Sequence, residues 1–380
     1  MKRIAILGST GSIGRQTLEV VSLFPDLFQV VAIGGGRRLD LLIEQAREFS
    51  PKKVAVMGEE EAKWLKGHLK GPEVLWGEEG LNEILDEVDL LVLALSGSVG
   101  FLPALKAIEK GIDIALATKE VLVMGGEIIT QRAKKRGVKL IPIDSEHSAI
   151  FQLLEGREKE EVESLILTAS GGPFYGMKDE AVEKVTPDEA LRHPVWKMGP
   201  KVSVDSATMM NKALEIIEAH WLFDLPKEKI KVFIHPQGIV HGMILLRDGS
   251  LLAHLAQPDM RIPIGYALSY PKRLHLPFKR LKAQDLLGLT FEEADPEKIP
   301  ALKLGFWALG VGGTMPTVLN AANEVAVKAF LEGKIKFTEI VPLVKEVMQE
   351  HKPFLIKDVE DVFSAHNWAQ QLTLRKIEKC

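Results

Sequence analysis

The stretch "IAILGSTGSIG", residues 4–14, sets a glycine-rich turn directly behind a short apolar run. In dinucleotide-binding domains such a turn joins the first strand to a helix whose N-terminus faces a phosphate. The glycines here are Gly8, Gly11 and Gly14, so Thr10 stands where the usual G-x-G-x-x-G pattern has its second glycine. An ordinary strand-to-helix turn is the alternative interpretation. The position of the turn at the start of an alternating domain favours nucleotide binding.

Short apolar runs alternate with amphipathic stretches over the first part of the chain. The runs are rich in Val and Ile and predict strands at residues 3–8, 28–34, 52–58, 89–95, 112–118 and 138–143. Helical periodicity lies between them, for example at residues 15–24, 39–49 and 101–111. This alternation predicts an α/β fold with a Rossmann-like parallel sheet. Because the strands are apolar throughout, we expect helices on both faces of the sheet.

The pattern changes after Ile143. Residues 231–256 read as short strands with turns, which predicts an α+β catalytic domain with an antiparallel-leaning sheet. Residues 206–223 predict one helix, and the polar, proline-punctuated stretch before them predicts a mobile flap. The predicted parts are a nucleotide-binding domain (1–144), a catalytic and dimerisation domain (145–270) with its flap at about 172–200, a linker (271–300) and a C-terminal helical domain (301–380).

Composition excludes several classes of protein. The chain has 380 residues, a net charge of −4, 46% hydrophobic and 26% charged residues, so no positive field argues for a nucleic-acid partner. No apolar run reaches the ~18–20 residues of a membrane span, and the first predicted strand starts too near Met1 for a signal peptide. The single cysteine, Cys380, argues against disulfides and thiolate catalysis. We therefore expect a cytoplasmic protein with neither a membrane nor a nucleic-acid partner.

The end of the second predicted strand indicates which nucleotide binds. NAD-binding folds have an acidic residue there, whereas this chain has "GGGRRLD" with Gly36, Arg37 and Arg38. Guanidinium groups match a 2′-phosphate, so NADP(H) is favoured over NAD(H); two solvated arginines are the alternative. A further turn, "ALSGSVGF", contains Ser96 and falls at the same edge of the sheet.

Two carboxylates stand together in "IPIDSEHSA". Asp144 and Glu146 follow a predicted strand, and residues two apart in an extended chain point to the same face. Further on, Asn211 and Glu215 share one face of a predicted helix. Three carboxylates with substrate oxygens would suit Mg²⁺ or Mn²⁺. Taken singly, the acidic pair is better explained as a solvated loop or a helix cap, and Glu215 as a charge on a helix surface; only a reason to bring the three together favours a metal site.

Several residues are candidates for binding a phosphorylated substrate. Some of them have hydroxyl, amide or ammonium donors and follow a predicted strand or lie near the start of a predicted helix, and the others belong to the candidate flap. The full set is Lys119, Ser170, His193, Trp196, Met198, Ser206, Asn211 and Lys212. Ser206 reads alternatively as a plain helix N-cap, and His193 and Lys119 as exposed surface residues.

These motifs together resemble the 1-deoxy-D-xylulose 5-phosphate reductoisomerase family, whose members use NADPH in non-mevalonate isoprenoid biosynthesis. The resemblance rests on "GSTGSIG", "ALATKE", "IPIDSEHSAIFQ", "TASGGPF", "HPVWKMGPKVSVDSATMMNKALEIIEA", "HPQGIVHGM" and "NAANEVAV", in that order. It runs from the N-terminus into the C-terminal helices. The order and the specificity of "DSEHSA" with "SVDSATMMNK" make the match close.

The resemblance implies roles for individual residues. It implies metal ligation by Asp144, Glu146 and Glu215, and catalysis by these three with Lys119. It implies substrate contacts for Lys119, Ser145, Glu146, Ser170, His193, Trp196, Met198, Ser206, Asn211, Lys212 and Glu215. The implied cofactor residues are Gly8, Thr10, Gly11, Ser12, Ile13, Gly36, Arg37, Arg38, Ser96, Thr118, Glu120 and Gly199. Three positions depart from the common pattern, namely Arg38, Thr118 and Tyr175, and none is a predicted metal ligand.

The implied reaction is the rearrangement of a five-carbon ketose phosphate followed by its reduction with NADPH, to 2-C-methyl-D-erythritol 4-phosphate. A divalent metal would serve as the Lewis acid, and members of the family are typically homodimers. Of three rival interpretations, the first, a semialdehyde dehydrogenase, is discarded because it would need a catalytic cysteine. The second is a metal-free sugar-phosphate dehydrogenase, and the third is an NADP-sensing protein without catalysis. A chelator experiment separates the second from the metal-dependent enzyme.

Overall fold

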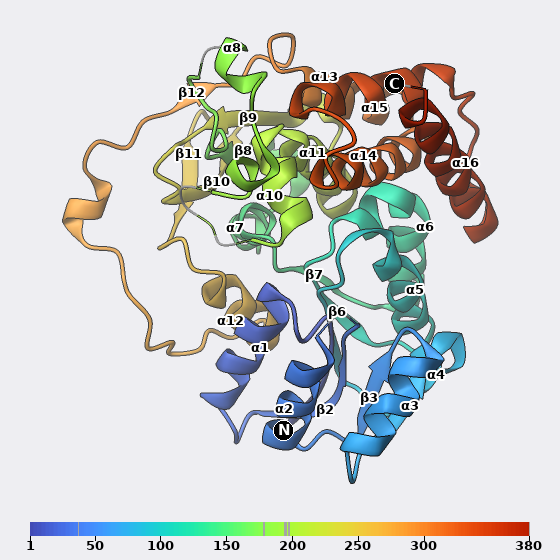
Figure 1. Cartoon of the computed structure of the whole chain (residues 1–380). Helices are drawn as coiled ribbons and strands as arrows, with labels where there is room; N and C mark the ends of the chain where they lie inside the picture. The colour runs from blue at the N-terminus through green and yellow to red at the C-terminus, as the bar shows by residue number, and fades with distance from the viewer. Residues whose placement is uncertain (37, 178, 194–195, 197, 380) are drawn as a thin grey trace. The chain divides into compact units, whose positions relative to one another are not determined.

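The computed structural model describes residues 1–36, 38–177, 179–193, 196 and 198–379. The chain divides into two compact units (Figure 1). The first unit contains residues 1–118, 131–148 and 259–278, and the second contains residues 119–130, 149–258 and 279–380. No helix in the described part of the chain is both long and apolar enough to cross a membrane.

A parallel sheet forms the centre of the first unit. Among the residues described it has seven strands in the order β4-β3-β2-β1-β5-β6-β7, and every neighbouring pair is parallel. The strands are β1 (Lys2–Leu7), β2 (Phe28–Gly34), β3 (Lys53–Val56), β4 (Glu73–Trp76), β5 (Leu90–Leu93), β6 (Asp113–Leu116) and β7 (Leu140–Pro142). The order reverses at β1, between β2 and β5, which is where nucleotides bind in doubly wound folds.

Helices connect these strands and cover the sheet. They are α1 (Ser12–Ser22), α2 (Leu39–Phe49), α3 (Glu59–His68), α4 (Gly77–Glu83) and α5 (Phe101–Glu109). The sequence predicted α1, α2 and α5 together with six of the strands. It missed β4, a four-residue strand at the edge of the sheet with a half-exposed pattern. So short an edge strand carries too little apolar sequence to be recognised.

A later segment also belongs to the first unit. Helix α12 (Arg261–Ser269) packs against α1, β6 and β7. The Nζ atom of Lys2 donates to the backbone oxygen of Leu268 over 2.7 Å, and Arg261 forms ion pairs with Asp259 and Glu19. Residues far apart in the sequence therefore complete this unit.

A mixed sheet forms one layer of the second unit. Its described strands run in the order β11-β10-β8-β9-β12. They are β8 (Val162–Ala169), β9 (Ile230–Ile234), β10 (Val240–Leu246), β11 (Leu251–Leu255) and β12 (Glu292–Glu293). The expected antiparallel pairing holds for β10 with β8 and with β11, whereas β8 and β9 are parallel because helices cross between them. The expected linker contributes β12 to this sheet.

Helices make up the rest of the second unit. They are α8 (Asp179–Val182), α9 (Pro187–Ala190), α10 (Pro200–Ala207), α11 (Met210–Phe223), α13 (Pro300–Val311), α14 (Met315–Leu331), α15 (Ile340–Glu350) and α16 (Val359–Ile377). Helix α6 (Glu120–Arg136), which bends at Gly125, and helix α7 (Ser145–Leu154) each have residues in both units. Buried side chains of α10, α11, α13, α14, α15 and α16 form one apolar core, so the C-terminal helices are part of the body that carries α11.

The predicted helix over residues 206–223 is two helices. Helix α10 ends at Ala207 and α11 begins at Met210, with Met209 between them at a positive φ of 63°. The expectation of one helix was wrong because side-chain periodicity does not report a single backbone residue in the left-handed region.

Candidate active site

Sterics explain two of the three glycines in the turn after β1. Gly8 has a φ of +93°, and a Cβ atom there would lie 2.2 Å from the carbonyl oxygen of Ala94. A Cβ atom on Gly14 would lie 2.2 Å from the carbonyl oxygen of Gly8. At Gly11 the nearest atom would be 3.1 Å away. Close backbone packing therefore requires glycine at positions 8 and 14 more strictly than at position 11.

The N-terminus of α1 directly follows the glycine turn. Helix α1 begins at Ser12, and its N-cap residue Gly11 supplies no side-chain cap. The N–H groups of a first helical turn, here including Ile13, point out of the helix end and favour a negative charge. The backbone N–H groups of Gly8 and Ser9 donate to the oxygen of Gly34 over 2.8 and 2.9 Å, which ties the turn to β2.

The other predicted cofactor residues lie in different surroundings. Gly36, Arg38 and Ser96 are exposed, Thr10, Thr118 and Glu120 are buried, and Gly199 is the N-cap of α10. The hydroxyl of Thr118 donates to the backbone oxygens of Leu93 and Leu95, over 3.2 and 2.6 Å. Arg37 lies outside the described residues. These observations place Gly36, Arg38, Ser96 and Thr118 in the loops at the carboxyl edge of the parallel sheet.

The acidic pair has a different backbone from the one expected. Strand β7 ends at Pro142, and Glu146 lies in the first turn of α7, so the argument from extended backbone was wrong. The two carboxylates are nevertheless neighbours, with ligand oxygens of Asp144 and Glu146 within 4.8 Å of each other. Ser145 donates to the Glu146 carboxylate over 2.5 Å. The start of the helix, rather than a strand, brings these acids together.

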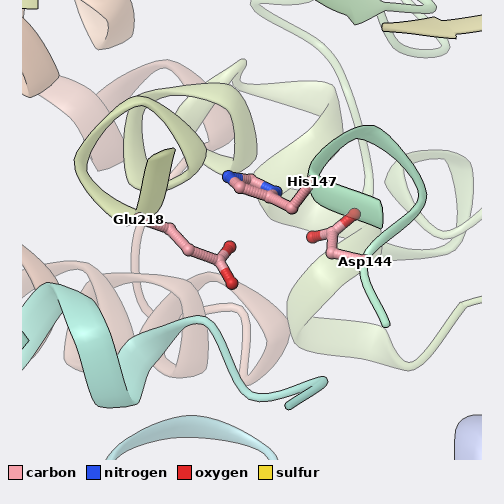
Figure 2. Close-up of side chains that lie close together, drawn as sticks. All are labelled: Asp144, His147 and Glu218. Carbon is pink, nitrogen blue, oxygen red and sulfur yellow. The ribbon is translucent and has the colours of Figure 1, made fainter. Parts of the chain in front are cut away.

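A histidine that the sequence interpretation missed lies beside Asp144. A ring nitrogen of the buried His147 is within 4.8 Å of an Asp144 oxygen. Figure 2 shows Asp144 just before α7 and His147 on its first turn; Glu218, which is drawn with them, belongs to α11. The signal was present in "DSEH", because Asp144 and His147 are three residues apart and such residues are neighbours at a helix start.

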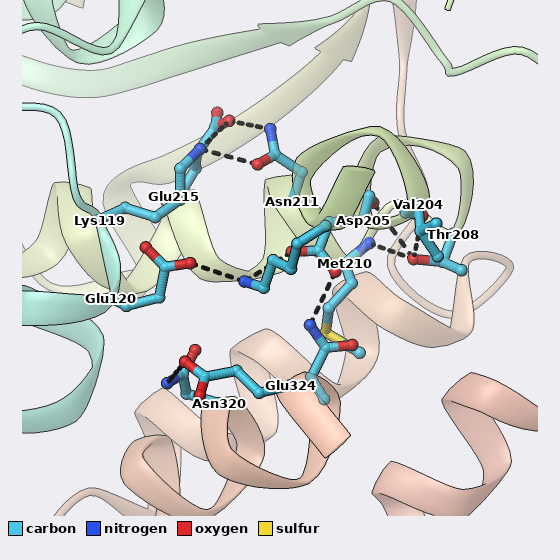
Figure 3. Close-up of polar contacts among 12 residues, drawn as sticks. Lys119, Glu120, Val204, Asp205, Thr208, Met210, Asn211, Glu215, Asn320 and Glu324 are labelled. Atoms are coloured by element: carbon cyan, nitrogen blue, oxygen red, sulfur yellow. Dashed lines mark hydrogen bonds and ion pairs between the residues drawn. The ribbon is translucent and has the colours of Figure 1, made fainter. Parts of the chain in front are cut away.

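Three predicted site residues surround the carboxylate of a fourth, Glu215, in the second unit. Glu215 of α11 is fully buried. Its Oε1 atom accepts hydrogen bonds from Lys119 Nζ over 3.0 Å and Asn211 Nδ2 over 2.5 Å, and its Oε2 atom forms an ion pair with Lys212. Lys119 Nζ also donates to Asn211 Oδ1 over 2.8 Å (Figure 3). A buried carboxylate held by two ammonium groups and an amide is a preorganised electrostatic site.

The predicted phosphate and flap residues also meet in the second unit. Ser170 Oγ lies 3.1 Å from His193 Nε2 and accepts from the N–H of Gly172 over 3.2 Å. The Nδ1 atom of His193 accepts from the backbone N–H of Trp196 over 2.9 Å, so the neutral ring carries its proton on Nε2 and donates to Ser170. Burial lowers the pKa of His193, which favours this neutral form.

Ser206 does not begin a helix. It lies in the last turn of α10, next to Asp205, so the N-cap interpretation was wrong. Met198, half-buried, stands just before α10. The missed break at Met209 explains the error, because it moves the start of the second helix to Met210.

A parallel sheet with a phosphate-type glycine turn defines a nucleotide-binding α/β protein, and the buried Lys119–Asn211–Glu215 cluster adds the polar groups of an enzyme. This is the class of pyridine-nucleotide-dependent oxidoreductases.

Comparison with known proteins identifies the family. The model of 1-deoxy-D-xylulose 5-phosphate reductoisomerase matches residues 4–126, and two models of the C-terminal domain match residues 140–223 and 255–372. The 1-deoxy-D-xylulose 5-phosphate reductoisomerase of Geotalea uraniireducens is 51% identical over 375 residues, covering 98% of this chain and 97% of the relative. That of Pelotomaculum thermopropionicum is 50% identical over 382 residues, covering 99% of each chain. The chain belongs to the 1-deoxy-D-xylulose 5-phosphate reductoisomerase family.

Solved structures of 1-deoxy-D-xylulose 5-phosphate reductoisomerases are similar to this chain along its whole length. A DOX-P reductoisomerase in complex with NADPH, fosmidomycin and magnesium is 37% identical, with a TM-score of 0.93 over 100% of this chain and 98% of that chain. The 1-deoxy-D-xylulose 5-phosphate reductoisomerase from Zymomonas mobilis in complex with NADPH is 38% identical, with a TM-score of 0.92 and full coverage of both chains. The expected family and the α/β fold class are confirmed.

Proposed function

We propose that the chain catalyses the NADPH- and divalent-metal-dependent rearrangement and reduction of 1-deoxy-D-xylulose 5-phosphate to 2-C-methyl-D-erythritol 4-phosphate in non-mevalonate isoprenoid biosynthesis. Family membership along nearly the whole chain supports this function. The observation that carries it within the chain is the buried Glu215 with Lys119, Asn211 and Lys212 around it. Such a cluster of buried, charged side chains favours a catalytic site over a site for binding alone.

Asp144, Glu146 and Glu215 would hold the metal. Carboxylates of Asp144 and Glu146 already lie together in the first unit, and the buried Glu215 forms ion pairs with Lys119 and Lys212 in the second. Three hard oxygen donors without a cysteine fit Mg²⁺ or Mn²⁺. A divalent cation there supplies Lewis acidity that stabilises negative charge on substrate oxygens.

The glycine turn and the N-terminus of α1 would hold the cofactor. Gly8, Gly14 and the helix end fit a pyrophosphate, which approaches backbone closely. Thr10, Gly11, Ser12 and Ile13 would line it, and Gly36, Arg37 and Arg38 would meet the 2′-phosphate. Ser96, Thr118, Glu120 and Gly199 would complete the site. NADPH supplies the reducing equivalents.

The substrate phosphate would bind to Ser170, Ser206, Asn211 and Lys212. Ser170 accepts hydrogen bonds from His193 and Gly172, which leaves its own hydroxyl hydrogen to donate to an anion. His193, Trp196 and Met198 would close over the substrate and exclude water from the reactive aldehyde. Anchoring the phosphate orients the carbons that react.

Lys119 would stabilise developing negative charge, and Ser145 would contact the substrate beside it. The ammonium of Lys119 is buried and held between Glu215 and Asn211, so it is fixed in place before substrate arrives. A preorganised cation in a site closed to water is worth more than one in solution.

We propose a homodimer in the cytoplasm. Strand β11 ends the order of the second sheet as far as the chain is described, and Leu251 and Leu255 on it are 52% and 37% exposed. An apolar edge strand favours pairing with another strand, here that of a second copy.

The proposed functional parts are the nucleotide-binding domain (1–144), the catalytic and dimerisation domain (145–270) with its flap at about 172–200, the linker (271–300) and the C-terminal helical domain (301–380).

Glu215→Gln tests the function. The amide keeps the size of the side chain but loses the charge that the metal and Lys212 require. We expect metal-dependent NADPH oxidation with 1-deoxy-D-xylulose 5-phosphate to fall by at least about 100-fold, with unchanged NADPH binding. In the wild type, EDTA should abolish turnover and Mg²⁺ should restore it. Exposed Glu228→Gln is the control. Full activity of Glu215→Gln would refute the metal assignment.

A further inference from the structure

Lys201 links two buried carboxylates in the second unit. It lies in the first turn of α10, and its Nζ atom is 2.7 Å from Glu120 Oε1 and 2.8 Å from Asp205 Oδ2. The side chains of Lys201, Glu120 and Asp205 are only 18%, 7% and 1% exposed. Figure 3 draws the polar contacts around Glu120 and Asp205. Helix α10 is thereby fixed to the start of α6.

Helix α14 holds the other side of the same carboxylate. The Nδ2 atom of Asn323, which is fully buried, donates to Asp205 Oδ1 over 2.8 Å, and Asn320 donates to Glu324 Oε1 over 3.0 Å. These three α14 residues belong to "NAANE", the first part of the motif "NAANEVAV" on which the family resemblance partly rests. The motif now has a contact with α10.

The network favours the charged forms of Lys201 and Glu120. Burial disfavours the ammonium of Lys201, but the attraction of Asp205, Glu120 and Glu324 outweighs it, and the pKa of Lys201 is raised. Burial likewise disfavours the carboxylate of Glu120, but Lys201 outweighs it, and the pKa of Glu120 is lowered. Removing Lys201 would leave two buried carboxylates without their shared cation, which is strongly unfavourable.

The network ends at two residues of the proposed active site. Glu120 directly follows Lys119, whose ammonium binds Glu215, and Asp205 directly precedes Ser206. A shift of Glu120 would therefore move the backbone of Lys119, and a shift of Asp205 would move Ser206.

We propose that Lys201 is a positioning residue of the reaction, which acts through Glu120 on Lys119 and through Asp205 on Ser206. The proposal rests on the proposed function of those two residues. It assigns the C-terminal helices a part in the reaction, because Asn323 holds Asp205 from α14. Groups that orient the residues of a site commonly change activity or metal affinity by about 10- to 100-fold when they are removed.

Lys201→Met is the decisive variant. We expect a higher KM for 1-deoxy-D-xylulose 5-phosphate through Ser206, and a lower kcat through Lys119. Together they should lower kcat/KM by about 10- to 100-fold. The Mg²⁺ concentration for half-maximal activity should rise as well. A purely structural role would reduce only the amount of folded enzyme and leave KM and the Mg²⁺ response unchanged. Lys159→Met, which breaks an exposed ion pair with Asp224, is the matched control.

A double-mutant cycle tests the route of action. If Lys201 works through Glu120, then at saturating NADPH, Lys201→Met combined with Glu120→Gln should lower kcat about as much as Lys201→Met alone. Additive losses would contradict that route. If Lys201→Met does not fold, Asn323→Ala tests the positioning role instead, because it removes only one neutral donor to Asp205. We expect the KM of this variant to rise by up to about tenfold.

The outcomes separate this proposal from the function on which it rests. A wild type without metal-dependent NADPH oxidation would refute the function. An active wild type, with folded Lys201→Met and Asn323→Ala variants of unchanged KM and Mg²⁺ response, would refute the positioning role alone.

Discussion

At the scale of single residues, the turn after β1 shows how a departure from a motif is accommodated. Thr10 occupies the position of the usual second glycine and is buried. A Cβ atom on Gly35 would lie 3.0 Å from Thr10 Oγ1, so a glycine on the neighbouring strand's loop gives the threonine its space. Gly35, which lies 25 residues after Thr10 in the sequence, therefore leaves room for a side chain at the position where the usual motif has glycine.

The same turn distinguishes two glycine substitutions. Gly14→Ala would press a Cβ atom onto backbone atoms of Gly8 and Ser9, whereas Gly11→Ala meets its nearest atom at 3.1 Å. We expect Gly14→Ala to cost about 1–3 kcal/mol in free energy of unfolding and to weaken NADPH binding strongly. Gly11→Ala should change both far less. Thermal unfolding and NADPH fluorescence titration measure the two effects, and equal losses in the two variants would contradict the steric account.

The sequence predicts which residues belong to the candidate site better than it predicts which residues bond to them. Asp144, Glu146, Lys119, Asn211 and Glu215 stand in motifs whose chemistry is local, so the sequence indicates them. The bonds of Lys201 to Glu120 and of Asn323 to Asp205 join residues 81 and 118 positions apart. No periodicity or spacing encodes such a pairing, because it depends on how helices pack.

At the scale of elements, the proposed flap contains a short helix with its own cap. Thr186 and Glu189 form a capping box at the N-terminus of α9: the Glu189 carboxylate accepts from Thr186 N over 2.9 Å, and Thr186 Oγ1 accepts from Glu189 N over 3.4 Å. Asp358 and Asp361 form a capping box at α16, outside that region. The same change, removal of the N-cap side chain, can therefore be made in a helix of the proposed flap and in a helix outside it.

Thr186→Ala should raise KM, whereas Asp358→Ala should not. Loss of an N-cap costs about 1 kcal/mol, which is roughly fivefold in an equilibrium constant. If α9 must be ordered for the flap to close, the KM of Thr186→Ala for 1-deoxy-D-xylulose 5-phosphate should rise about fivefold. Asp358→Ala should lower only the free energy of unfolding. Steady-state kinetics on both variants, with urea unfolding, make the comparison; an unchanged KM for Thr186→Ala would show that α9 plays no part in closure.

Elements with a strong apolar pattern were predicted well, and their boundaries less well. Buried strands such as β1 and β5 have continuous apolar runs, and α2 has a clear amphipathic face. The two-residue strand β12 and the break at Met209 have no such signal. They form because tertiary packing imposes them on a sequence that is locally neutral.

At the scale of the whole molecule, buried and half-buried histidines couple folding to pH. Burial lowers the pKa of His193, His235, His351 and His366, so the folded chain holds these rings neutral at pH values where an unfolded chain would protonate them. They come from separate parts of the second unit: the flap region, the loop before β10, the end of α15, and α16. The effect therefore belongs to the fold rather than to one site.

The sign of this coupling follows from proton binding. Below the ordinary histidine pKa of about 6.5 the unfolded chain binds more protons than the folded one. This contribution to stability is therefore complete above that pH and is lost as the pH falls from there through the lower pKa of the folded state. We expect the melting temperature to drop between about pH 7.5 and pH 5.5, before carboxylates titrate. His366→Gln should shrink the drop, because the Nδ1 atom of His366 is buried without a hydrogen bond partner among the described residues. Asn367→Gln, at the next, exposed position of α16, should leave the drop unchanged. Calorimetry at the two pH values measures the difference, and a melting temperature that is constant or rises on acidification would contradict the neutral burial of these rings.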